Sequence, residues 1–101
     1  MEHFDWIRGW AEQRNLVDGS DPKSQFLKLI EEVGELSRGI GKDNLPEIID
    51  AIGDTIVVLT IIAQQYDLAV EECIDAAWHQ IKDRKGKMVN GVFVKEVLTM
   101  V

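Results

Sequence analysis

The sequence lacks several features that would assign it to a common protein class at once. It holds a single cysteine among 101 residues, which excludes an internal disulfide and a zinc site built on cysteines. Its two histidines, His3 and His79, are too far apart to give a metal-binding spacing. No repeat and no low-complexity tract is present. A metal site in this chain would therefore have to use carboxylates.

Long apolar runs and positive charge are also scarce. The longest strongly apolar stretch, residues 55–63, is too short to span a bilayer, and the first ten residues carry two acids and no apolar run, unlike a signal peptide. The 18 acids outnumber the 11 bases, and the formal charge of −7 argues against a surface that grips a nucleic-acid backbone. We therefore expect a cytoplasmic protein with neither a membrane nor a nucleic acid as its partner.

Apolar periodicity and turn signals predict an all-α fold with four helical stretches and a short tail. Asp21 followed by Pro22 is a specific helix-start signal. Asn44 is expected to cap the third helix, with Glu47 reaching back as in a capping box. The helices are expected at about 4–15, 22–39, 45–66 and 67–81, with Gly39 and Gly41 ending the second and a hairpin turning on Asn90-Gly91 in the tail at 88–94.

The third helical stretch is apolar on nearly every side over residues 55–63. Its β-branched residues make a buried strand the competing interpretation, but the pattern continues from Glu47 without a turn signal and so favours a helix. Such a segment must be buried all round, and a chain of 101 residues buries only a modest share of its surface when it folds alone. We expect one domain resembling a four-helix bundle, completed by association into a homodimer or homotetramer.

Acidic residues occur at helical spacing in the second stretch. Glu31, Glu32 and Glu35 lie near one another on a helix, where like charges repel. Lys28, one turn before Glu32, can offset part of that repulsion. A run of glutamates is often only a solvated face, and for Glu31 alone that interpretation is the better one.

The third stretch places Glu47, Asp50 and Asp54 on a single helix face. Asp54 leads directly into the apolar run, where a carboxylate costs several kcal/mol unless it is paired or binds a metal ion. No base occurs between residues 43 and 78, so a bound cation is the simplest partner. If the two helices pack antiparallel, their acidic faces converge, and clustered carboxylates suit Mg²⁺ or Mn²⁺.

Two glycines accompany these acids. Gly34 immediately precedes Glu35, and Gly53 immediately precedes Asp54. Glycine inside a helix costs about 1 kcal/mol relative to alanine. The placement suggests that another backbone or a ligand approaches closely at both positions.

These residues resemble the MazG-like nucleotide pyrophosphohydrolases, whose pattern is EExxE, a gap, and then ExxD. Here the pattern reads Glu31-Glu32-x-x-Glu35, followed by an acidic helix ending in Asp50-Ala51-Ile52-Gly53-Asp54 and an apolar run. The resemblance covers about residues 6–87, with its specific part at 26–63. It implies an all-α, magnesium-dependent hydrolase that cleaves (deoxy)nucleoside triphosphates to monophosphate and pyrophosphate.

The resemblance also implies a ligand set, with one departure. Glu32, Glu35 and Asp54 fall on the family's metal-ligand positions, and Glu31 on that of an accessory acid. Where the family has a glutamate three residues before Asp54, this chain has Ala51. Asp50 or Glu47 must then supply the fourth carboxylate. We favour Asp50, although the register in which residues 47–50 form the ExxD is the alternative.

Catalysis would require Mg²⁺, or Mn²⁺ in its place, to bridge Glu32, Glu35, Asp50 and Asp54 to the substrate phosphates, with Glu31 or Glu35 orienting or deprotonating the attacking water. The phosphates also need cationic contacts, and a base pocket needs flat apolar walls. A helix C-terminus equally explains a basic cluster, and tryptophans on an apolar stripe are usually core. The candidate substrate contacts are Lys28, Lys82, Arg84, Lys85, Lys87, Trp6 and Trp10.

Two alternatives stay open. A non-catalytic helical module could use the apolar third helix to bind a partner protein, but it leaves the acids beside the glycines unexplained. A phosphoribosyl-nucleotide pyrophosphatase keeps the enzyme class and changes the substrate. No residue in the sequence decides between this substrate and a nucleoside triphosphate.

Overall fold

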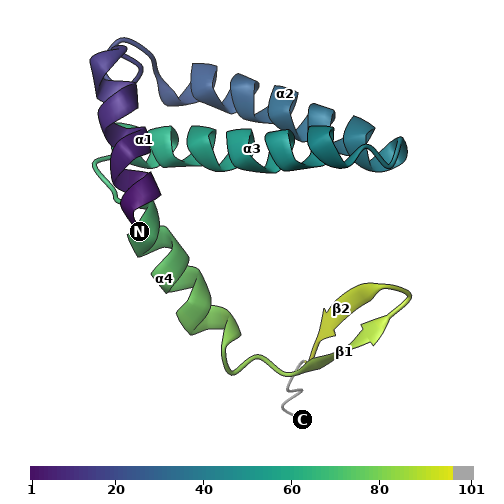
Figure 1. The fold of residues 1–101 in the computed structure, drawn as a ribbon. Helices are drawn as coiled ribbons and strands as arrows, with labels where there is room; N and C mark the ends of the chain where they lie inside the picture. Colours follow the sequence, from purple (N-terminus) through teal and green to yellow (C-terminus); the bar gives the residue numbers. More distant parts are fainter. Residues whose placement is uncertain (97–101) are drawn as a thin grey trace. The chain divides into compact units, whose positions relative to one another are not determined.

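The computed structural model describes residues 1–96, and helices dominate them (Figure 1). The all-α prediction is confirmed, and residues 55–63 are helical. The chain divides into two compact units, residues 1–70 and residues 71 onward. In chain order the elements are α1 (Glu2–Gln13), α2 (Pro22–Gly41), α3 (Leu45–Gln65), α4 (Val70–Ile81), β1 (Gly86–Val89) and β2 (Val92–Lys95).

Side-chain caps begin α2 and α3 as the sequence predicts. The Asp21 carboxylate accepts a hydrogen bond from the Ser24 backbone N–H at 2.8 Å, with proline at the first helical position. The Asn44 side chain accepts one from the Glu47 N–H at 3.3 Å. Glu47 does not complete a capping box. Its carboxylate instead accepts a hydrogen bond from Nε of Arg38 at 2.8 Å, which ties α2 to α3.

The ends of α1, α2 and α3 share one backbone motif that the sequence analysis missed. An Asn or Asp takes the left-handed conformation just after each helix, and the next N–H bonds to a carbonyl five residues earlier, as in a Schellman motif. As expected, Gly41 is the last residue of α2, but the helix passes through Gly39, and the residue in the left-handed position after the helix is Asp43 and not a glycine. Because α3 ends at Gln65 and Asp67 turns the chain in the left-handed conformation, α4 begins at Val70 and not near residue 67. The left-handed residues are Asn15, Asp43 and Asp67.

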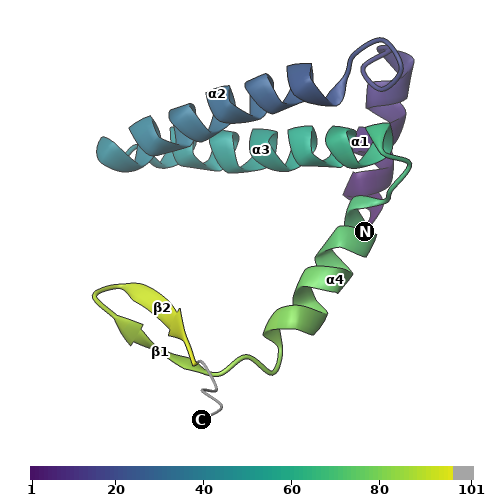
Figure 2. The same ribbon diagram turned by 180° about the vertical axis from the view of Figure 1, so that it is seen from behind.

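Within residues 1–70, α2 and α3 form an antiparallel pair, and α1 packs across the C-terminal part of α3 (Figures 1 and 2). The helices of the pair approach closely at Gly39, where an added Cβ would lie 3.2 Å from both Cγ1 and the backbone nitrogen of Ile48. By contrast, a Cβ at Gly34 or Gly53 would meet no described atom within 4 Å. Among residues 1–96, the expected close approach of another backbone at these two glycines is thus absent.

The core lies along α3. Five of its residues are buried (Ala51, Val58, Thr60, Ile61 and Ala63), and α1 adds Ala11. The side-chain amides of Gln64 and Gln65 donate to the backbone carbonyls of Arg8 and Leu16, both at 3.3 Å, and fix α1 and its following loop to the end of α3. The helix is not buried on all sides, however, because Ile56 and Leu59 remain exposed.

The second unit contains α4 and the hairpin. Asn90 and Gly91 both have positive φ, 51° and 81°, and connect the antiparallel strands with Val89 opposite Val92. This confirms the predicted Asn-Gly hairpin. Cys73 on α4 is exposed. No described helix combines the length and apolarity needed to cross a membrane.

Candidate metal centre

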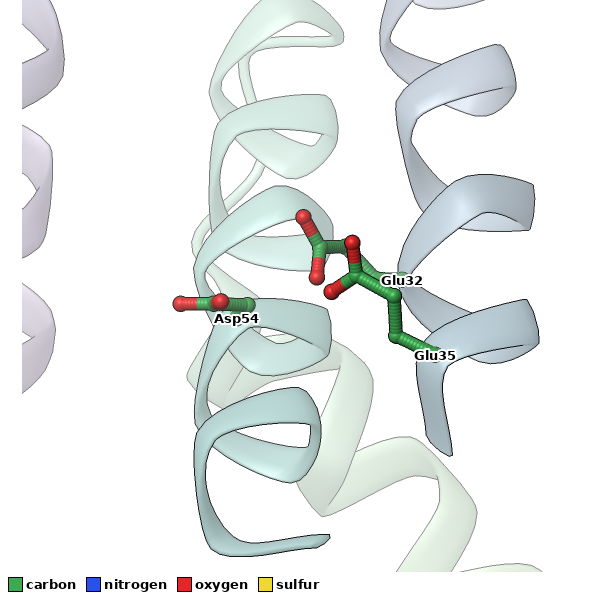
Figure 3. A group of neighbouring side chains, drawn as sticks. All are labelled: Glu32, Glu35 and Asp54. Atoms are coloured by element: carbon green, nitrogen blue, oxygen red, sulfur yellow. The ribbon is translucent and has the colours of Figure 1, made fainter. Parts of the chain in front are cut away.

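Three carboxylates from two helices come together in the first unit. Glu32 and Glu35, one turn apart on α2, extend toward α3, which carries Asp54 (Figure 3). One oxygen of each lies within 4.8 Å of the others. The two acidic faces therefore converge as the sequence predicts, since the antiparallel pairing brings the middle of α3 beside these turns of α2.

Glu32 is the most unusual residue of the cluster. It is only 4% exposed, whereas Glu31 on the same helix is exposed and Glu35 is half-buried. Its Oε1 lies 3.2 Å from Lys28 Nζ, whereas its Oε2 is buried without a hydrogen-bond partner. An unsatisfied buried carboxylate oxygen is costly and rare in folded proteins. A cation held jointly with Glu35 and Asp54 would satisfy it, and an all-oxygen donor set suits Mg²⁺ or Mn²⁺.

The close negative charges of the cluster disfavour the ionised form of its own carboxyl groups. The Glu32 carboxylate raises the pKa of Glu35, through its close side-chain oxygens and through its negative charge. Burial raises the pKa of Asp54, and the negative charges of Asp50 and Glu32 raise it further. Lys28 is the one cation that works in the opposite direction at Asp54. The site is thus short of positive charge.

The other acids of the predicted site lie outside this triad. Asp50 is exposed and acts on Asp54 through its charge, but its carboxylate is not one of the three that converge. Its role as fourth ligand stays a prediction. Glu31 is exposed and lies 3.6 Å from Lys28 Nζ. Ala51 is 1% exposed, so the position that bears a glutamate in the pattern is filled by a small buried side chain.

A mainly apolar pocket of about 440 Å³ adjoins the cluster. Trp6, Ile7 and Trp10 of α1 form one wall, and Asp54 and Val57 of α3 the other. The indoles of Trp6 and Trp10 stay 62% and 44% exposed, so they are not core residues. The structure thus brings both candidate base-binding tryptophans beside a candidate metal ligand.

The basic candidates occupy different places. Lys28 lies at the cluster, paired with Glu31 and Glu32. The remaining four belong to the second unit: Lys82, Arg84 and Lys85 lie between α4 and β1, and Lys87 lies in β1. Their contact with substrate stays a prediction. Sequence reasoning missed Lys95, which lines a pocket together with Arg84 and Lys85. The hairpin register, which places β2 beside β1, was the signal that could have found it.

An all-α fold whose facing helices gather carboxylates is typical of helical proteins that bind divalent cations. Residues 20–89 match the MazG nucleotide pyrophosphohydrolase domain. The match spans well over half of the chain and includes all three clustered carboxylates. The chain therefore belongs to the MazG nucleotide pyrophosphohydrolase family.

The chain is also similar to a protein of Haemophilus phage HP1 (strain HP1c1) that is named an uncharacterized 18.2 kDa protein in the rep-hol intergenic region. The two are 55% identical over 60 residues, which cover 58% of this chain and 36% of the phage protein. The chain thus spans about a third of that relative's length. No solved structure matches the chain.

Proposed function

We propose that the protein hydrolyses (deoxy)nucleoside triphosphates to the monophosphate and pyrophosphate with Mg²⁺, for which Mn²⁺ can substitute. The observation that carries this proposal is the convergence of Glu32, Glu35 and Asp54, with one buried oxygen of Glu32 left without a partner. Membership of the MazG family supports the reaction class. The cation and the substrate are inferences from the chemistry of the donor set.

In this proposal Glu32, Glu35 and Asp54 hold the cation, with Asp50 as the fourth carboxylate. A divalent ion supplies positive charge for the phosphate oxygens and lowers the pKa of a water molecule. Glu31 or Glu35 orients or deprotonates the attacking water. Glu35 belongs to the cluster, and the Glu31 carboxylate shares Lys28 Nζ with Glu32, at 3.6 Å and 3.2 Å, so both carboxylates are near the proposed cation site.

The pocket beside Asp54 suits the nucleobase. Trp6 and Trp10 offer exposed aromatic surface, on which a base can stack. Because Asp54 lines the same pocket, a base held there would be next to the cation-binding carboxylates. The tryptophans therefore position the substrate in this proposal and take no part in the chemistry.

The test incubates the pure protein with each (deoxy)nucleoside triphosphate and Mg²⁺ and measures monophosphate, pyrophosphate and orthophosphate. We expect pyrophosphate, with turnover abolished in Asp54→Asn and Glu35→Gln while helical circular dichroism is retained. Glu12→Gln, which alters an exposed carboxylate on α1, is the matched control and keeps full activity. Release of orthophosphate from the triphosphate, or activity that survives both site substitutions, contradicts the proposal.

We also propose that the chain acts as a homodimer or homotetramer. Ile52, Ile56 and Leu59 follow one another at spacings of four and three along α3 and remain exposed. A row of large apolar side chains on a helix is typical of a surface that packs against another helix. Multi-angle light scattering at micromolar concentration tests this, and a clean monomer refutes it.

A further inference from the structure

The unit that begins at residue 71 holds another pocket, lined by charged residues, at the base of the hairpin. Its volume is about 460 Å³. The Glu96 N–H donates to the Lys85 carbonyl at 2.8 Å, and Lys95 lies opposite Gly86 across the strands, so residues eleven and nine positions apart in the sequence meet there. The lining residues are Gln80, Asp83, Arg84, Lys85, Lys95 and Glu96.

The charge of this segment is opposite to that of the rest of the chain. Residues 82–96 contain five bases and two acids, whereas the 81 residues before them contain six bases and 16 acids. Two acids line the same pocket, yet Arg84, Lys85 and Lys95 form no ion pair with any residue among 1–96. Three cations thus border one concave site without a protein counter-charge bound to them.

The helix dipole explains only part of this arrangement. Lys82, Arg84 and Lys85 directly follow α4, where positive charge is favourable at a helix C-terminus. Lys95 belongs to β2 and reaches the pocket only because the hairpin folds back. A purely structural role at the helix end therefore does not account for its position.

We propose that this pocket binds a condensed phosphate, either inorganic pyrophosphate or the phosphate tail of a nucleoside triphosphate. Arginine and lysine side chains match phosphate oxygens through charge-assisted hydrogen bonds, and the Gln80 amide adds a neutral donor. The volume lies in the range of small-ligand sites. The 16 acids before residue 82 repel a long polyanion such as DNA.

Binding at this pocket does not require the acidic triad to be a metal site. The natural source of the ligand does rest on the proposed function, because that reaction consumes a triphosphate and releases pyrophosphate. Binding is therefore measured without divalent cations, in EDTA, on the whole chain. Glu32→Gln, which removes the buried carboxylate charge, serves to separate the two proposals.

The experiment titrates pyrophosphate, ATP, orthophosphate and a duplex DNA into ¹⁵N-labelled protein and follows amide shifts with calorimetry in parallel. We expect pyrophosphate to shift the amides of Arg84, Lys85 and Lys95, and to bind more tightly than orthophosphate. Loss of one charge-assisted contact should weaken binding about tenfold in Lys95→Gln, and likewise in Arg84→Gln. Lys42→Gln is the matched control, because it removes the same charge as Lys95→Gln and lies just after a helix as Arg84 does, but at the C-cap of α2 in the first unit.

Each outcome of this experiment either supports or overturns the proposed condensed-phosphate pocket. Unchanged affinity in Lys42→Gln and Glu32→Gln, with the loss confined to the pocket variants, supports the proposal even if no hydrolysis is ever detected. If ATP and pyrophosphate bind equally, the pocket takes the phosphate tail alone, whereas weaker binding of ATP identifies free pyrophosphate as the ligand. Equal losses in Lys42→Gln and Lys95→Gln would reveal only general charge attraction, and tighter binding of duplex DNA than of pyrophosphate would indicate a nucleic-acid surface. Either of these two results would overturn the proposal.

Discussion

Asp54→Asn should make the cation-free protein more stable while it removes the response to cations. Asp54 lies within 4.8 Å of Glu32 in a cluster where burial and neighbouring negative charges raise its pKa. The uncharged amide relieves this repulsion at nearly constant shape. A substitution that abolishes function and raises the melting temperature would identify the carboxylate as a group kept for binding.

The magnitude follows from the separation. Two full charges 4.8 Å apart repel by about 1 kcal/mol in bulk water and about 3 kcal/mol at an effective dielectric constant of about 20. Partial protonation relieves some of this in the folded protein, because the pKa of Asp54 is raised. We therefore expect a gain near the lower value, about 1 kcal/mol, which corresponds to a melting temperature about 4–8 °C higher for a chain of this size.

The pH dependence has a definite sign. A carboxyl whose pKa is raised by folding binds its proton more tightly in the native state, so the free energy of unfolding falls as pH rises from the ordinary value of 3.8 through the raised pKa. The advantage of Asp54→Asn should be largest at pH 7–8 and shrink toward pH 4. The pKa of Glu35 is also raised, so its effect on the free energy of unfolding has the same sign.

Thermal melts by circular dichroism, in EDTA and in excess Mn²⁺ or Mg²⁺, provide the assay. Saturation at about 100 times the dissociation constant stabilises a protein by about 2.7 kcal/mol, so the wild type should melt well above its cation-free value and Asp54→Asn should not. If Asp54→Asn melts below the wild type in EDTA at pH 7.5, the carboxylate is stabilised by the protein itself. The electrostatic reasoning would then be wrong.

Three further predictions follow from single positions. Gly39→Ala should lower the melting temperature, because overpacking against Ile48 costs about 1–3 kcal/mol. Gly34→Ala, with open space around it, should instead raise the free energy of unfolding by about 1 kcal/mol. Thermal melts of both variants check this, and equal shifts in melting temperature would contradict the close approach at Gly39. The hydrogen bond from the Ser24 N–H holds the pKa of Asp21 low, so the charge of Asp21 stabilises α2 above pH 3.8, and this contribution is lost as pH falls through the lowered pKa. Asp21→Asn keeps an oxygen that can accept the cap hydrogen bond. The difference in melting temperature between this variant and the wild type should therefore disappear in acid. Trp10→Ala should raise KM for nucleoside triphosphates about tenfold if the base stacks there, with the Mn²⁺-induced rise in melting temperature unchanged; an unaltered KM would return Trp10 to a structural role.

Local signals were the predictable part of the fold. Asp21-Pro22 and Asn44 act through backbone groups within three residues, and Asn90-Gly91 through its own dihedral angles, so each needs no tertiary context. Amphipathic periodicity likewise gave the number and type of helices. These elements were correct because the forces that specify them lie within a few residues.

The errors arose where tertiary contacts compete with local chemistry. Glu47 has the right spacing for a capping box, but Arg38 on the facing helix offers a charged partner and takes its carboxylate. Gly39 looked like a helix end, yet its lack of a side chain serves the approach of Ile48. The sequence does not state which of two possible uses of a residue the fold requires.

The candidate site contains both kinds of residue: some are placed by local helical periodicity and others by tertiary contacts. Glu32 and Glu35 come together by helical periodicity alone, so the sequence was sufficient for them. Their meeting with Asp54 depends on how α2 and α3 are aligned, and the exposure of Asp50 depends on which face of α3 turns inward. The burial of Glu32 is likewise a tertiary property, since nothing in its neighbouring residues distinguishes it from Glu31.

That alignment follows from the contact between Gly39 and Ile48. Measured along an antiparallel pair at about 1.5 Å per residue, Glu35 and Glu32 lie about 6 and 10 Å back from Gly39, while Asp54 lies about 9 Å beyond Ile48. The two distances agree, so the close approach at a glycine sets the level at which carboxylates from the two helices meet. Position 51 lies about 4.5 Å beyond Ile48, close to the level of Glu35, so a glutamate there would lie beside the cluster. Because position 51 is alanine, a cation in this cluster would be bound by the three carboxylates that converge. The buried oxygen of Glu32 that has no hydrogen-bond partner is the one that would gain most from such a cation.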